Sequence, residues 1–112
     1  MRYALLIHET ENGARPMSQD KVMEAYGVFT EGVMKDGVMG VAERLRPASE
    51  ATSVRVRDGK TLVTDGPFAE TKEQFGGFYI LDCKTLEEAQ AYAAKIPSAL
   101  YGTIEVRPIW EM

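Results

Sequence analysis

The chain has 112 residues, of which 45% are apolar and 27% are charged, the composition of one ordinary globular domain. Its 17 acidic and 13 basic side chains give a formal charge of -4, so the surface does not suit polyanions, and nucleic-acid binding is not expected. A single cysteine, Cys83, and a single histidine, His8, exclude an intramolecular disulfide and a four-ligand zinc site. No sequence motif indicates a nucleotide, flavin, haem or metal cofactor.

The beginning of the chain has no apolar run long enough for a signal peptide or a membrane span. The longest early run, residues 3–7, is followed at once by Glu9 and Glu11, which we interpret as a solvated edge. We therefore expect a cytoplasmic protein that does not contact a membrane, a location that also suits one reduced thiol.

The first third of the chain predicts a strand, a helix and a second strand. Residues 2–7 lack helical spacing and contain five consecutive apolar residues, which is typical of a central strand covered on both faces. Ser18 is a candidate N-cap for a helix that Gly37 ends, and residues 38–45 predict the next strand. The apolar stripe of this helix consists of Val22, Tyr26, Phe29 and Val33.

A β-hairpin follows. Apolar and polar residues alternate with a period of two over residues 53–57, which predicts the first strand of the hairpin. Residues 61–64 predict the second strand after a short break. Asp58 and Gly59 in that break are a preferred two-residue hairpin turn.

The last third predicts a strand, a helix and a final strand. Gly76 and Gly77, which indicate a bulge or a close backbone approach, open the strand of residues 78–81. Thr85 begins a helix through a capping box, and residues 103–107 form the last strand. The predicted buried face of this helix consists of Leu86, Ala89, Tyr92, Ala93 and Ile96.

Without the hairpin, the order of elements is β-α-β-β-α-β, which predicts a single ferredoxin-like α+β domain over residues 1–112. In that fold, both helices cover one face of an antiparallel sheet. The other face then needs a cover, because the large apolar residues are more numerous than one face uses. These residues are Tyr3, Leu5, Phe78, Ile80, Ile104 and Trp110. We therefore expect a homodimer in which the two sheets face each other.

Residues 64–79 resemble the DGPF-domain proteins of the YCII-related family. The run begins with the motif Asp65, Gly66, Pro67 and Phe68. The hairpin, the helix opening at Thr85 and residues 105–108 are also similar to that family, so the resemblance covers nearly the whole chain. It implies a dimeric α+β barrel.

The resemblance implies two classes of function. The wider family includes a chlorinated-hydroquinone dehydrochlorinase, and DGPF members often accompany extracytoplasmic-function sigma factors. Part of the family has a histidine and aspartate pair, but the matching positions here are Tyr26 and Lys35. Because a tyrosine with its ordinary pKa of about 10 is a poor proton acceptor near neutral pH, that mechanism does not carry over.

The candidate catalytic residues are His8 and Asp65. His8 ends the first strand, and it is the only side chain whose unperturbed pKa lies near neutrality, so it is the natural general base. The alternative interpretation is that His8 is an ordinary surface or hydrogen-bonded histidine without a catalytic role. Asp65 either lines a pocket as a base or hydrogen-bond acceptor, or only stabilises its own turn.

The candidate substrate-binding residues are Tyr26, Arg44, Phe68 and Tyr79. Phe68 would form a wall of the pocket. Arg44 belongs to a local cationic set that either binds an anion or forms a solvated face that discourages edge-to-edge aggregation. The other members of this set are Arg46, Arg55 and Arg57.

The leading hypothesis is a homodimeric, cofactor-free protein that binds a small molecule between its helices and its sheet. The sequence leaves open whether it also catalyses a lyase or dehydrochlorinase-like reaction. The alternative is a regulatory partner of an extracytoplasmic-function sigma factor, which would contact the hairpin and residues 70–74.

Overall fold

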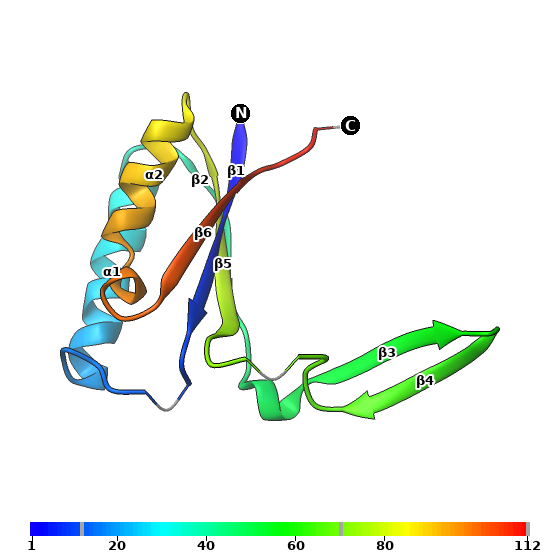
Figure 1. Cartoon of the computed structure of the whole chain (residues 1–112). Coiled ribbons are helices and arrows are strands. Elements are labelled where there is room, and N and C mark those ends of the chain that lie inside the picture. The colour runs from blue at the N-terminus through cyan, green and yellow to red at the C-terminus, as the bar shows by residue number, and fades with distance from the viewer. Residues whose placement is uncertain (12, 70, 112) are drawn as a thin grey trace.

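Two interleaved β-α-β units build a four-stranded antiparallel sheet, from which a hairpin projects (Figure 1). The structure is a computed structural model that describes residues 1–11, 13–69 and 71–111. In chain order, the elements are β1 (Arg2–Glu9), α1 (Gln19–Lys35), β2 (Met39–Arg44), η1 (Ala48–Glu50), β3 (Thr52–Arg57), β4 (Lys60–Asp65), β5 (Gln74–Asp82), α2 (Leu86–Lys95), η2 (Pro97–Leu100) and β6 (Thr103–Pro108), where η marks a 3-10 turn. The loop predicted to contact a sigma factor begins at Glu70, which lies outside the described residues.

The strand order is β2-β5-β1-β6, and every neighbouring pair is antiparallel. This is the predicted ferredoxin-like α+β arrangement, with β1 in the centre and both helices on one face (Figure 1). No helix of the described ranges is long and apolar enough to cross a membrane.

Both predicted helix starts are confirmed by their caps. The Ser18 hydroxyl accepts a hydrogen bond from the Lys21 amide at 3.3 Å, and the Thr85 hydroxyl accepts one from the Glu88 amide at 3.1 Å. The predicted buried face of α2 needs one correction. Leu86 is 41% exposed, because it is the first residue of the helix and lies at the rim of the core.

The sheet has one buried face and one open face, so within one chain the first strand is covered on one side, and cover of the other side by a second copy stays a prediction. Tyr3, Leu5 and Ile7 of β1 are buried beneath the helices, while the residues between them point the other way and are half-buried. The helices therefore account for only one face. We call the other side the open face; it carries Ala4, Leu6, His8, Val41, Phe78, Ile80 and Glu105.

The hairpin is the predicted one, extended by Thr52 and Asp65 at its outer ends and by Lys60 beside the turn. Asp58 and Gly59 have positive φ angles of 51° and 73°, as a two-residue hairpin turn requires. The hairpin projects on the side of the open face, away from the helices (Figure 1). It contributes to a Cα radius of gyration of 15.9 Å, against about 13 Å for a compact chain of this length.

The open face predicts that the protein self-associates, and sedimentation at micromolar concentration should show a dimer. Val41→Glu places a charge on this face and should weaken the dimer by about a hundredfold or more, because a two-fold contact repeats each substitution. Val28→Glu is the matched control on the exposed side of α1, where Val28 is 65% exposed, and it should leave the dimer unchanged. A stable wild-type monomer would contradict the sheet-to-sheet arrangement.

Candidate functional site

A cavity of about 230 Å³ lies between α1 and the helix-facing side of the sheet. Its floor comes from the strands, through Ile7, Ala42, Gly77 and Tyr79, and one wall comes from α1, through Val22, Met23 and Tyr26. The polar side chains around it are those of Glu9, Arg15, Gln19, Arg44 and Tyr101; Glu43 also lines it, but its side chain follows the strand alternation to the opposite face. The predicted pocket between helices and sheet thus corresponds to a real cavity with an apolar floor and a polar rim.

Gly77 keeps the floor of this cavity open below Arg44. The two residues pair across β5 and β2, and Gly77 is buried. A Cβ atom on Gly77 would lie only 2.8 Å from the carbonyl oxygen of Glu43, so the strands approach too closely there for any side chain. The predicted close backbone approach is therefore confirmed at Gly77, and the predicted alternative, a bulge, is found at Gly76.

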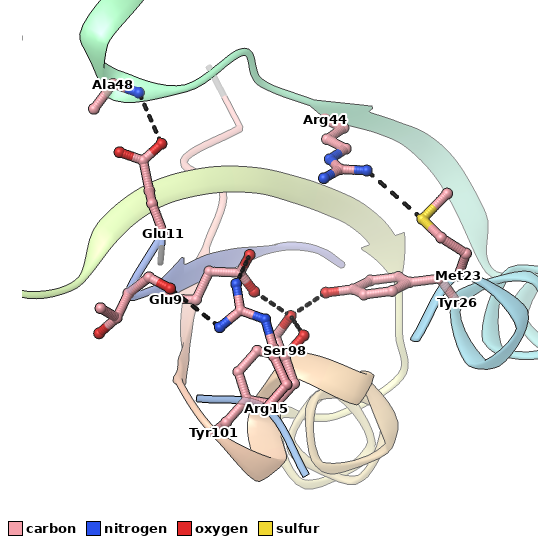
Figure 2. Close-up of polar contacts among 10 residues, drawn as sticks. Glu9, Glu11, Arg15, Met23, Tyr26, Arg44, Ala48, Ser98 and Tyr101 are labelled. Atoms are coloured by element: carbon pink, nitrogen blue, oxygen red, sulfur yellow. Dashed lines mark hydrogen bonds and ion pairs between the residues drawn. The ribbon is translucent and has the colours of Figure 1, made fainter. Parts of the chain in front are cut away.

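A buried hydroxyl group, that of Ser98, links Tyr26 to Glu9 beside the cavity (Figure 2). Ser98 lies in η2 and has no exposed surface. Its Oγ donates to Glu9 Oε2 at 2.6 Å and also contacts the Tyr26 hydroxyl. Ser98 has a single hydroxyl proton, and this proton forms the hydrogen bond to Glu9. The Tyr26 hydroxyl must therefore donate its own proton in the hydrogen bond to Ser98. The hydrogen bonds therefore run in one direction, from Tyr26 through Ser98 to Glu9.

Arg15 holds the other side of the Glu9 carboxylate. Its Nη2 lies 3.5 Å from Glu9 Oε1, its Nη1 donates to the Thr10 carbonyl at 3.1 Å, and its guanidinium stacks 4.4 Å from the Tyr101 ring centroid. The Glu9 side chain is only 24% exposed. The prediction of a solvated edge is therefore wrong for Glu9. Glu11 is exposed, and its carboxylate accepts a hydrogen bond from the Ala48 amide at 2.9 Å.

Burial, with a smaller contribution from the nearby Glu9 charge, raises the pKa of Tyr26 to about 12. Tyr26 is consequently a neutral phenol at physiological pH. It can give or pass on a proton, but it cannot accept one unless it releases its own at the same time.

The predicted substrate-binding residues fall in different places. Tyr26, Arg44 and Tyr79 all line the cavity, and the Tyr79 hydroxyl bonds to Thr30 Oγ1 at 2.9 Å. Phe68 is 81% exposed and lies outside it. The cationic set is also divided: Arg46 pairs with Glu50 at 3.1 Å, while Arg55 and Arg57 share one face of the hairpin.

The predicted catalytic residues do not line this cavity. His8 lies on the open face, with its Nε2 3.3 Å from Glu105 Oε1 and its ring centroid 5.6 Å from that of Phe75. There it lines a wider depression together with Phe68. Asp65 is exposed at the end of β4 and lines neither space. A catalytic role for His8 and Asp65 stays a prediction.

Four polar residues of this site were not predicted as functional: Glu9, Arg15, Ser98 and Tyr101. One sequence signal could have found Glu9. It continues the period-two series of Tyr3, Leu5 and Ile7, so it shares their face at the end of β1. Ser98 has no such signal, because its partners come from β1 and α1.

The raised pKa of Tyr26 predicts how stability depends on pH. Between pH 10 and about 12, the folded protein retains the Tyr26 proton that the unfolded chain has already released. The free energy of unfolding must therefore fall as pH rises through this window. Tyr26→Phe should make that fall less steep in denaturant titrations. Tyr92, whose hydrogen bond to Asp36 also raises its pKa to about 12, accounts for a remaining slope. An unchanged slope in Tyr26→Phe would contradict the assignment.

Ser98→Ala should destabilise the protein by about 1–3 kcal/mol, because it leaves the half-buried Tyr26 hydroxyl and Glu9 carboxylate without a shared partner. Ser53→Ala is the matched control. The Ser53 hydroxyl donates to the Gly66 carbonyl at 2.8 Å at the partly exposed base of the hairpin, where water can replace it, so we expect a loss below about 1 kcal/mol. Equal losses in urea unfolding would contradict a special role for Ser98.

Comparisons with known proteins agree over the full length of the chain. The model of the YCII-related domain matches residues 1–112. A protein of Rhizobium meliloti (strain 1021), named uncharacterized protein R00369, is 38% identical over 114 residues, which cover 97% of this chain and 92% of that relative. The resemblance noted in the residue motifs is thereby confirmed at the level of the family, and the chain belongs to the YCII-related family.

Proposed function

We propose that this protein binds a small organic anion in the cavity between α1 and the sheet and moves a proton to or from it, using its own side chains alone. The observation that carries the proposal is the buried Ser98 hydroxyl that connects Tyr26 to Glu9. A hydroxyl in that position converts a tyrosine that is a poor base by itself into one end of a proton relay.

The direction of the hydrogen bonds supports abstraction of a proton from the ligand. As the Tyr26 oxygen takes a proton from the ligand, its own proton passes to Ser98 Oγ, and the Ser98 proton passes to the Glu9 carboxylate. The ligand has then lost one proton, and Glu9 has gained one. The apolar floor of the cavity excludes water and so strengthens each of these interactions. Elimination reactions of the lyase or dehydrochlorinase type begin with this kind of step.

Arg44 supports an anionic ligand. Its side chain lies on the cavity side of β2, where Nη1 contacts the sulfur of Met23 at 3.6 Å (Figure 2). Within the described residues, no carboxylate forms an ion pair with Arg44, whereas Arg15 is matched by Glu9. Glu43 follows the alternation of the strand to the opposite face, so its charge does not neutralise Arg44. The cavity thus holds one unmatched positive charge.

The size of the cavity favours a small ligand. Its volume of about 230 Å³ lies below the range of about 300–1,000 Å³ that is usual for drug-sized molecules. We therefore propose a short-chain or single-ring carboxylate, with its carboxylate at Arg44 and its reacting carbon near Tyr26. The regulatory alternative, a sigma-factor partner at the hairpin and residues 70–74, makes no use of this cavity.

A thermal-shift screen of hydroxy, keto and aryl carboxylic acids tests the proposal, since a ligand at 100 times its dissociation constant should add about 2.7 kcal/mol of stability. For a bound acid, Arg44→Gln should weaken binding at least about tenfold, or about 1.4 kcal/mol. The Tyr26→Phe variant should bind the acid with a dissociation constant within a few-fold of the wild-type value. It should, however, lose the exchange of the ligand's C–H proton with deuterated solvent, which NMR measures.

His8→Gln and Asp65→Asn serve as the matched controls, because both residues lie outside the cavity. They should leave binding and exchange at the wild-type level. Loss of exchange in these two variants, with normal exchange in Tyr26→Phe, would transfer the site to the open face and overturn the proposal.

A further inference from the structure

A second pocket of about 430 Å³ adjoins the cavity, and we call it the outer pocket. The two spaces share five lining residues, so they open into each other. The shared residues are Glu9, Arg15, Gln19, Arg44 and Gly76. The outer pocket adds three polar side chains, those of Glu11, Arg46 and Gln74. A molecule that is bound at Arg44 can therefore extend from the apolar cavity into a second, more polar space.

Arg46 lies two residues after Arg44 and on the same side of the chain. The pairing with β5 continues beyond the end of β2, because the Leu45 amide donates to the Gly76 carbonyl at 2.9 Å. Pro47 then restricts Arg46 to extended backbone. Side chains alternate along an extended chain, and every second residue lies about 7 Å further on. The two guanidinium groups are therefore close enough to hold both ends of one short molecule.

The side chains that line the outer pocket carry more positive than negative charge, because three arginines face two glutamates there. Arg15 is matched by Glu9 at 3.5 Å. Glu11 keeps one carboxylate oxygen on the Ala48 amide at 2.9 Å (Figure 2). In the part of the chain that the structure describes, Arg44 forms no ion pair. The group that these charges attract is therefore a second anion rather than a cation.

Arg46 can change its partner without a large loss. Within the described residues, its ion pair is with Glu50, four positions further along the chain, at 3.1 Å. The two side chains are 83% and 48% exposed, and ion pairs that are this exposed contribute little to stability. A carboxylate that enters the outer pocket can therefore replace Glu50 at Arg46, and Glu50 then returns to water.

We propose that the ligand is a dicarboxylate, with one carboxylate at Arg44 and the other at Arg46 in the outer pocket. This inference rests on the proposed function, because it names the second charged group of the same ligand. The spacing of the two arginines suits a chain of about four to six carbon atoms. The carbon beside the inner carboxylate stays the reacting one, since Arg44 and Tyr26 line the same cavity.

Three acids with the same four-carbon chain test the outer pocket by calorimetric titration of the full chain: butanoic, 4-aminobutanoic and butanedioic acid. Butanedioic acid should bind at least about tenfold more tightly than butanoic acid, because its second carboxylate reaches Arg46. The amino acid should bind no more tightly than butanoic acid, because the arginines repel its ammonium group.

Each other outcome overturns a stated part. Equal binding of butanoic and butanedioic acid would overturn the second subsite alone, and tightest binding of the amino acid would reassign the outer pocket to a cation. If none of the three binds while another acid of the screen does, the dicarboxylate is wrong and the proposed function stands. If no acid of the screen binds, both are wrong.

Charge changes at the rim test the assignment to Arg46. Arg46→Gln should bring butanedioic acid to within about threefold of butanoic acid and leave butanoic acid unchanged. Glu50→Gln should strengthen butanedioic acid by about threefold or more, because Arg46 loses its competing partner. Arg57→Gln, on the hairpin, is the matched control for net charge and should change neither acid. An unchanged preference in Arg46→Gln, or the same loss in Arg57→Gln, would overturn the assignment.

Discussion

The hydrogen bond between Ser98 and Glu9 connects parts of the fold that local structure does not bring together. Ser98 lies beyond α2, Glu9 ends β1, and Tyr26 lies in the middle of α1. A carboxylate that is largely withdrawn from water costs several kcal/mol unless it is paired, and Glu9 is paired by Ser98 on one side and Arg15 on the other. The positions of η2, of the end of β1 and of α1 are therefore coupled, and β1 and α1 both contribute residues to the lining of the cavity.

Most of the fold could be predicted because its elements carry local signals. Ser18 and Thr85 mark helix starts through caps, and the Asp58 and Gly59 turn fixes the hairpin. The site could be predicted only in part. Tyr26 was found because it belongs to an apolar stripe, whereas Ser98 and Glu9 are 89 positions apart and meet only in the tertiary structure. Glu9 at the end of β1 was predicted to be a solvated edge, because a strand pattern ends where hydrophobic residues end.

The proposed relay uses Tyr26, where the motif resemblance implies a histidine in part of the family, and a tyrosine and a histidine handle protons differently. Histidine titrates near neutrality and accepts a proton directly. With a pKa of about 12, Tyr26 needs an acceptor for its own proton, and a carboxylate is available through Ser98. In the proposed relay the carboxylate is that of Glu9 at the end of β1, which reaches Tyr26 through the Ser98 hydroxyl.

The alternation of side chains along β1 separates two kinds of surface within one strand. Ile7 and Glu9 face the cavity, while Leu6 and His8 face the side that helices leave uncovered. Because adjacent residues on one strand serve opposite faces, single substitutions should separate the proposed ligand binding from the predicted self-association. A shift of β1 against β5, however, would move both surfaces at once. The bulge opposite the step from Ile7 to His8, where Gly76 is the extra residue of β5, is the irregular point of that pairing, while the period-two series of β1 continues without interruption to Glu9.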